Sequence, residues 1–406
     1  MRRKIFILIL FIIPAIIITG CSAIKTIKAI NGGHVESSCD YTTKFQMIGT
    51  TLFLKVKINN DTAEYDFIFD TGAINAVDTK LAKKFNLHEV SHVEAKDASN
   101  KSNTVSVYKL DKLSVGNIVE KDLGVIAMDF DFVSNAIGHK VDGLIGNNFL
   151  KFFKITINLQ DTTLIFSSDI KALTAPYGAC LIPFWQDMKN AYAPKLKCRI
   201  NSSYETEAVI DYGNNGTVSI PEIDIENSGL LKTSKFIESK GSIGGGAFGI
   251  DAKNYLIRLN DFSIGKLHCT DMMVMSTPST TCMIGEKFLR CFKVTINYAT
   301  SQMVFEPLNS FSPPENEYSI GISALKNENE NFKIIGLWKT SAADSAGPLV
   351  DDEITEINSI PSKSFTNEYF SKILHNDSII TYTLGIKRKE VEKKITLQKH
   401  LLLPIK

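Results

Sequence analysis

The feature that most constrains the fold is an internal repeat. Residues 145–166 and 284–305 share Gly, Phe, Leu, Lys, Thr, Ile, Asn and a closing Phe at an offset of 139 positions. Two weaker matches link 67–70 with 208–211 and 113–116 with 262–265, and all three matches occur in the same order in both copies. Self-similarity of this kind indicates a duplicated unit, here of roughly 130 to 140 residues.

Within each copy the pattern indicates short β-strands. Residues 52–58 alternate partially between apolar and polar side chains, and a turn at 59–61 follows. Residues 155–159 and 164–166 predict a hairpin. Short helices are expected at about 78–85 and 147–153. The predicted fold class is therefore mainly β, with two similar lobes arranged in tandem.

The sequence also predicts how the rest of the chain is divided. The composition of 311–314, Phe-Ser-Pro-Pro, is typical of a linker, and the pattern changes after it. We expect the following segments: a leader at 1–20, a tether at 21–40, the first lobe at 41–170, the second lobe at 171–310 and an α+β domain at 311–406.

The N-terminus predicts export. A basic Met-Arg-Arg-Lys start precedes an apolar run over 5–18, which is short for a membrane span and typical of a signal peptide. The run ends in Thr-Gly-Cys at Cys21, which resembles a bacterial lipobox and implies cleavage before Cys21 and acylation of its thiol. An ordinary signal peptide or an uncleaved anchor is the alternative. We expect a lipoprotein of the cell envelope, anchored in the membrane.

Bulk charge excludes one class of partner. Lys and Arg total 45 against 44 Asp and Glu, a net charge of +1, so no global field attracts nucleic acid. Six cysteines remain besides Cys21, and their pairing is not readable because six thiols allow 15 pairings. No CxxC or HExxH spacing occurs, and neither a metal nor a cofactor is expected.

Three apolar residues, 67–69, lead into the turn Asp70-Thr71-Gly72-Ala73. Val-Asp-Gly-Leu-Ile-Gly at 141–146 lies 76 residues after Asp70. These motifs, in two copies over about 250 residues, resemble the pepsin and retropepsin superfamily. The resemblance implies bilobal acid-protease folding and a strand that crosses the Asp loop.

The same resemblance implies that each lobe supplies one catalytic carboxylate. Asp70 is the first candidate, and Asp211, at the matching place in the second copy, is the other. Two adjacent carboxyls share one proton, so the ionised one can activate water while the protonated one binds the substrate carbonyl. Thr71, Gly72 and Gly213 are the expected supporting residues.

The second turn departs from the family pattern, because Tyr212 stands where the family has Thr or Ser. Its ring has to be redirected to avoid crowding Thr71. The departure leaves two interpretations open. Either the dyad tolerates the tyrosine, or the second lobe keeps the fold and has lost competent geometry.

A glycine-rich stretch follows at 241–249 and contains a formal GxGxxG. A strand-like segment at 255–259 follows it where a dinucleotide site needs a helix. Gly244, Gly245 and Gly246 are instead expected at a mobile hairpin tip that resembles the flap of retroviral proteases. A plain flexible loop is the alternative. The equivalent segment of the first lobe, 97–103, is polar.

The region from Tyr318 to Leu401 resembles a bacterial PDZ domain, through the runs at 341–347 and 351–358. The resemblance implies that the loop at Ile320, Gly321 and Ile322 receives the C-terminal carboxylate of a peptide. The alternative is a domain that only packs on the lobes.

The sequence as a whole predicts an exported aspartic endopeptidase that acts on polypeptides. A non-catalytic peptide-binding lipoprotein on a degenerate protease scaffold is the alternative. A third hypothesis pairs Asp70 with Asp70 of a second molecule, and the duplication makes that arrangement less economical.

Overall fold

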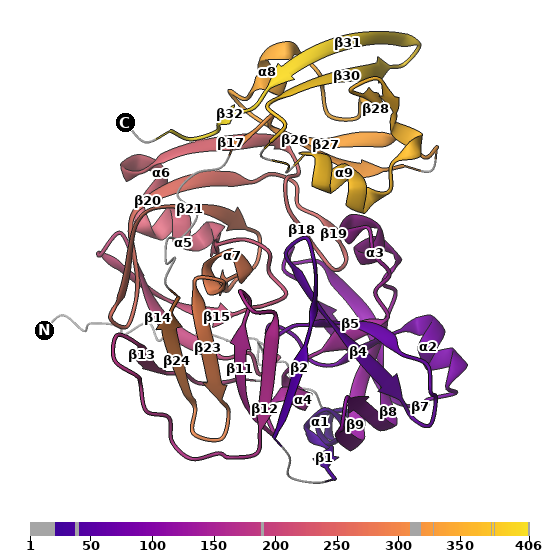
Figure 1. The fold of residues 1–406 in the computed structure, drawn as a ribbon, viewed down its shortest axis with the longest axis vertical. Helices are drawn as coiled ribbons and strands as arrows, with labels where there is room; N and C mark the ends of the chain where they lie inside the picture. Colours follow the sequence, from indigo (N-terminus) through magenta and orange to yellow (C-terminus); the bar gives the residue numbers. More distant parts are fainter. Residues whose placement is uncertain are drawn as a thin grey trace, which may run out of the picture.

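The structure is a computed structural model, and it describes residues 21–404 except 37–39, 188–190, 309–317, 328, 375 and 377. The predicted leader at 1–20, Cys39 and the linker at 311–314 lie outside the described residues. The fold is mainly β, as predicted, with three large sheets (Figure 1). No helix within the described ranges has the length and apolar character needed to cross a membrane.

A nine-stranded sheet builds the first lobe, which we define as residues 46–150 together with the preceding α1 (Cys21–Asn31) and β1 (His34–Val35) that pack on it. Its strands are β1, β3 (Gln46–Ile48), β4 (Thr51–Ile58), β5 (Tyr65–Phe69), β6 (Ala76–Asp78), β7 (His88–Lys96), β8 (Ser102–Val115), β9 (Ile118–Met128) and β10 (Gly143–Ile145). The helices here are α1, α2 (Thr79–Lys84), α3 (Asp131–Ile137) and α4 (Asn147–Leu150). The two helices expected near 78–85 and 147–153 are therefore α2 and a shorter α4.

The two copies of the repeat meet in a six-stranded sheet between the lobes. Its order is β13 (Cys180–Pro183), β24 (Gln302–Pro307), β23 (Phe292–Asn297), β11 (Lys154–Asn158), β12 (Thr163–Ser167) and β2 (Tyr41–Lys44). The central pair, β11 and β23, is antiparallel, and Thr156 lies directly opposite Thr295 with the two hydroxyl oxygens 2.9 Å apart. These threonines occupy the same position of the repeat, so the copies are related by an approximate twofold axis at this pair.

The second lobe, residues 193–289, and the C-terminal unit, residues 318–404, share one thirteen-stranded sheet. The lobe supplies β14 (Lys195–Ile200), β15 (Tyr204–Ile210), β16 (Val218–Pro221), β17 (Lys235–Gly241), β20 (Tyr255–Ile264), β21 (Leu267–Thr277) and β22 (Cys282–Ile284). The unit supplies β26 (Ile322–Lys326), β27 (Phe332–Trp338), β28 (Glu353–Ile357), β29 (Ile360–Pro361), β30 (Thr381–Arg388) and β31 (Val391–Gln398).

Smaller elements complete these two parts. The helices are α5 (Glu222–Ser228), α6 (Leu230–Thr233), α7 (Glu286–Leu289), α8 (Ala342–Ala346) and α9 (Asn367–Leu374), with a 3-10 turn at Ser362–Ser364. A short hairpin joins β18 (Gly245–Gly246) to β19 (Gly249–Ile250), and β25 (Tyr318–Ser319) pairs with the distant β32 (His400–Leu401).

One continuous apolar core runs through both lobes, and the C-terminal unit has its own. The shared core includes Phe69 of the first lobe, Ile157 of the central sheet and Ile257 of the second lobe. In the C-terminal unit, Phe332 and Phe370 stack with ring centroids 3.8 Å apart. Five buried cysteines, Cys180, Cys198, Cys269, Cys282 and Cys291, are free thiols.

Candidate active site

Each lobe delivers its aspartate by the same strand arrangement. β5 runs parallel to β10, and the amide of Asp70 donates to the carbonyl of Ile145 at 2.9 Å. β15 runs parallel to β22, and the amide of Asp211 donates to the carbonyl of Ile284 at 3.0 Å. The strand that crosses each Asp loop, expected from the family resemblance, is thus present in both copies.

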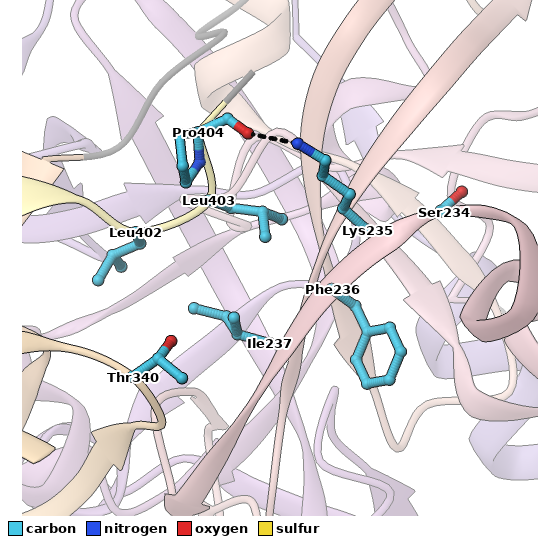
Figure 2. A pocket seen from close by; sticks show the side chains of 8 residues that line it. All are labelled: Ser234, Lys235, Phe236, Ile237, Thr340, Leu402, Leu403 and Pro404. Atoms are coloured by element: carbon cyan, nitrogen blue, oxygen red, sulfur yellow. Dashed lines mark hydrogen bonds between the residues drawn. The ribbon is translucent and has the colours of Figure 1, made fainter. Parts of the chain in front are cut away.

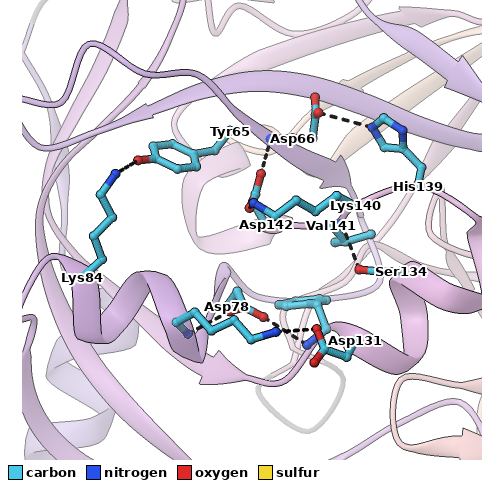
Figure 3. Close-up of polar contacts among 12 residues, drawn as sticks. Tyr65, Asp66, Asp78, Lys84, Asp131, Ser134, His139, Lys140, Val141 and Asp142 are labelled. Carbon is cyan, nitrogen blue, oxygen red and sulfur yellow. Dashed lines mark hydrogen bonds and ion pairs between the residues drawn. The ribbon is translucent and has the colours of Figure 1, made fainter.

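A polar network fixes the crossing strand of the first lobe before it reaches the Asp loop (Figure 3). The buried carboxylate of Asp142 accepts the amide of Asp66 at 3.0 Å and pairs with Lys140 at 2.6 Å. Its carbonyl accepts the amide of Asp78 at 2.8 Å. His139 Nε2 lies 3.2 Å from the carboxylate of Asp66. These contacts brace the start of β10 against β5 and so fix where Asp70 is presented.

The two Asp loops face each other across the lobe boundary. A Cβ placed on Gly72 would lie 2.6 Å from the carboxyl carbon of Asp211, and one on Gly213 would lie 2.6 Å from that of Asp70. Because no side chain fits at those distances, each glycine is required by the aspartate of the other lobe. Asp70 and Asp211 are therefore neighbours within one molecule.

The carboxyls of Asp70 and Asp211 lie close enough for each to change the pKa of the other. Backbone amides bond them: Gly72 donates to Asp70 at 2.7 Å and Gly213 donates to Asp211 at 2.9 Å. Burial raises the pKa of both carboxyls, and the negative charge of Asp70 adds to the rise in the pKa of Asp211. The pair consequently holds one proton under conditions in which isolated carboxyls have lost theirs.

Thr71 locks the two loops with its hydroxyl. Thr71 Oγ1 donates to the carbonyl of Ile210 at 2.7 Å and accepts the amide of Tyr212 at 3.1 Å, in a fully buried position. The ring of Tyr212 lies in the core instead of the loop, 5.8 Å from the ring of Phe69 in an edge-to-face arrangement. Within the described part of the chain, Tyr212 Oη has no hydrogen-bond partner. The departure from the family pattern therefore redirects a ring and leaves the Thr71 contacts intact.

Sequence reasoning missed Asn147, which supports the first loop. Its side-chain amide donates to the carbonyls of Thr71 and Ala73 at 2.8 and 2.9 Å, and its oxygen accepts the hydroxyl of Tyr298 at 3.0 Å. The repeat places Glu286 at the corresponding position of the second lobe. The substitution of an amide by a carboxyl directly after the Ile-Gly strand was a visible signal that the two loops are supported differently.

Glu286 is fully buried, and one of its carboxylate oxygens pairs with Arg290. The other oxygen has no partner among the described residues, and burial raises the pKa of this carboxyl. The second loop therefore lacks the amide donor that Asn147 gives the first.

The glycine-rich stretch forms a hairpin, with β18 and β19 as its strands and Gly244, Gly245 and Gly246 on its first arm. The hairpin contacts the first lobe, where the amide of Phe248 donates to Asp97 at 2.7 Å. The two lobes thus contact each other at two places, the Asp loops and this hairpin.

The predicted carboxylate loop of the C-terminal unit lies between β25 and β26. Ile320 is buried, Gly321 adopts a left-handed φ of 86°, and Ile322 begins β26. The amide of Gly321 donates to Ser319 Oγ at 3.0 Å. A peptide carboxylate at this loop would have to replace that bond.

Two other features lie outside the site, the predicted lipidation residue and a group of acidic side chains. Cys21 is the first residue of α1, far along the chain from the Asp loops. Within the described ranges, one acidic group, Asp78, Asp129 and Asp131, has carboxylate oxygens within 4.8 Å of one another. Asp78 caps α2 and Asp131 pairs with Lys80 at 2.6 Å, so these charges already have protein partners.

Comparisons with known proteins address the scaffold. A comparison with curated proteins found no match. Among solved structures, the chain is similar to the crystal structure of basic 7S globulin from soybean, at 11% identity and a TM-score of 0.41, over 66% of this chain and 95% of that one. A family model described as aspartyl protease matches residues 54–149. The segment of the first lobe that carries Asp70 is therefore similar to the aspartyl proteases.

Proposed function

We propose that the chain is an aspartic endopeptidase in which Asp70 and Asp211 act together on a polypeptide substrate. One observation carries the proposal. The two carboxyls lie side by side at the lobe boundary, and each abuts a glycine of the opposite loop. A purely structural role would not require two acids to lie side by side, each packed closely against a glycine of the opposite loop.

The raised pKa of both carboxyls suits them to acid–base chemistry. The ionised carboxylate takes a proton from water as the water oxygen bonds to the peptide carbon. The protonated carboxyl hydrogen-bonds the carbonyl oxygen, where negative charge develops. The C–N bond then breaks as a proton passes to the leaving nitrogen, which leaves a carboxylic acid and an amine.

The direct test measures cleavage of an unstructured protein at mildly acidic pH by three variants. D70N and D211N should each lower the rate by about 10²- to 10⁴-fold, because each removes one of the two proton-transfer groups. D111N is the matched control, since Asp111 is exposed on β8 and should leave the rate unchanged.

Two results would overturn this assignment. Full activity in D211N would indicate that Asp70 pairs with its counterpart in a second molecule. An absence of pepstatin-sensitive cleavage across a broad pH range, together with measurable peptide affinity, would favour a non-catalytic peptide-binding protein.

We also propose that the protein is exported and anchored in the cell envelope through a lipid on Cys21. Residues 1–20 support this by their basic start and apolar run. A C21S variant should leave the membrane fraction, whereas the matched change S22A should stay in it. Membrane retention of C21S would contradict lipidation as the anchor.

A third part of the proposal assigns peptide or partner binding to the PDZ-like C-terminal unit. The loop 319–322 and the neighbouring strand β26 support it. Binding of a peptide with a free C-terminal carboxylate should exceed that of the same peptide amidated at its C-terminus. Equal binding of both would contradict carboxylate capture.

A further inference from the structure

The glycine-rich hairpin is fastened to the first lobe by specific contacts. The amide of Phe248 donates to Asp97 at 2.7 Å, and Ser99 Oγ donates to the carboxylate of Asp251 at 2.7 Å. Gly246 packs so closely on Asp97 that a side chain there would collide with the carboxylate. Five residues of two loops, far apart in the chain, thus form one junction.

Apolar packing strengthens this junction. Ala247 and Phe248 lie against an apolar cluster of the first lobe that includes Phe53 and Met128. In the opposite direction, Ala98 of the first lobe packs on Val209 and Met283, which belong to the two strands beneath the Asp211 loop. The junction therefore closes the lobe boundary next to the proposed dyad.

The root of the hairpin belongs to another part of the molecule. The last residues of β17, 239–241, pair with 336–338 of β27 in the C-terminal unit. The amide of Ser242, which starts the hairpin, donates to the carbonyl of Ile335 at 2.8 Å. A side chain on Gly336 would collide with the backbone of Ser242. The hairpin is consequently a direct extension of a strand that the C-terminal unit holds.

The C-terminal unit is also fastened to the second lobe at its far end. The buried guanidinium of Arg258 donates to the carbonyl of Leu403, with Nε at 3.0 Å, and Lys235 Nζ donates to the carbonyl of Pro404 at 3.0 Å. Figure 2 shows the second contact beside an open groove of about 450 Å³. Leu403 packs with Trp338 of β27 in one apolar cluster.

The first lobe touches the C-terminal unit at a different place. Helix α3 contacts both α9 and β26 of the C-terminal unit, and Figure 1 shows α9 directly above it. Among the described strands, β26 pairs with β27 alone, so its other edge is open to pairing. An extended peptide that adds to this edge would have to displace α3.

We propose that the hairpin, residues 242–251, is a latch that holds the two lobes together beside the proposed dyad, and that the C-terminal unit releases it when an extended polypeptide pairs with the open edge of β26. The inference rests on the proposed function, which makes this lobe boundary the place where substrate must enter. Displacement of α3 separates the C-terminal unit from the first lobe. Because β27 carries the root of the hairpin, that movement pulls residues 242–251 away from Asp97 and Ser99.

Hydrogen exchange of the hairpin amides tests the latch without requiring activity. S99A removes the bond to Asp251 and should accelerate exchange over 244–251 by about fivefold, the effect of one net hydrogen bond. S102A is the matched control, because Ser102 is exposed nearby on β8. Its exchange should equal that of the unchanged protein.

A second pair of variants tests control by the C-terminal unit. G336A pushes on Ser242 from β27 and should accelerate exchange over the same amides, although it touches neither the first lobe nor the dyad. G385A is the matched control, since a side chain there meets Thr355 and Glu356 of the same unit, away from the hairpin. If G336A leaves exchange unchanged, or G385A accelerates it equally, control by the C-terminal unit is refuted.

Cleavage separates this inference from the proposed function. A peptide long enough to reach β26 should accelerate hairpin exchange in the D70N protein, which retains the latch. If the peptide accelerates hairpin exchange but the unchanged protein cleaves no substrate, the latch is supported and the protease assignment is rejected. Unchanged exchange with that peptide, in a protein that does cleave, would reject the latch and keep the protease.

Discussion

Replacing Thr71 by valine tests whether a single hydroxyl holds the two Asp loops together. Valine keeps the size and shape of the side chain but neither donates nor accepts a hydrogen bond. The change therefore leaves the carbonyl of Ile210 and the amide of Tyr212 buried without a hydrogen-bond partner. A buried polar group left without its partner costs about 1–3 kcal/mol, so two such groups cost about 2–6 kcal/mol.

The loss should be near the upper half of that range because the second lobe offers no replacement. In the corresponding position, Tyr212 turns its ring into the core and gives no hydroxyl to the opposite loop. T71S is the control, since serine keeps both hydrogen bonds and loses only a methyl group, worth about 1 kcal/mol. The difference between T71V and T71S isolates the hydroxyl.

Urea unfolding followed by tryptophan fluorescence gives the loss of stability, and hydrogen exchange at the Tyr212 amide locates it. T71V should also lower cleavage about 10²-fold or more, because the carboxyls shift relative to each other. If T71V and T71S unfold within about 1 kcal/mol of each other, the Thr71 lock does not carry the loop geometry and the reasoning is wrong.

Three further predictions concern the dyad and a buried acid elsewhere. G213A should abolish cleavage and destabilise the fold by about 1–3 kcal/mol, because its Cβ would lie 2.6 Å from the Asp70 carboxyl carbon, whereas G216A, with its nearest atom at 3.1 Å, should keep most activity. Burial raises the folded-state pKa of Asp70 and Asp211, so stability from this site is present at acid pH and is lost as the pH rises through the folded-state pKa. D211N should make the urea midpoint depend less on pH between about pH 4 and pH 8. An unchanged dependence would contradict the shared proton. Burial raises the pKa of Glu120 to about 8, so the stability that its neutral form contributes at lower pH is lost as the pH rises above about 8. E120Q should therefore be more stable than the unchanged protein at about pH 9. Equal urea midpoints of the two proteins at that pH would exclude a buried neutral acid.

Much of the fold was predictable because the repeat consists of short segments in which many residues recur at a fixed spacing. The alternation at 155–159 predicts a strand, and its copy at 292–297 predicts another. Asp70 was identifiable because apolar residues on one side and Thr-Gly on the other leave few roles for a carboxyl at a strand end. The hairpin at 241–249 followed from glycines that no helix favours.

Other features depend on contacts between distant segments, which no local pattern encodes. Asn147 supports the Asp70 loop through carbonyls more than seventy residues away. Ser99 meets Asp251 only after both lobes have formed. The Pro-containing linker at 311–314 predicted a separate domain, and the pairing of β17 with β27 joins that domain to the second lobe in one sheet.

Two similar β lobes, each with a carboxyl at the end of a buried strand, could be read from the chain because the hydrophobic period and the duplication are local patterns. The pairing of Asp70 with Asp211 across the lobe boundary, and the turn of Tyr212 away from them, appeared only in the folded molecule. The direction of that ring depends on the space beside Phe69 in the assembled core, and such space exists only once the lobes have packed.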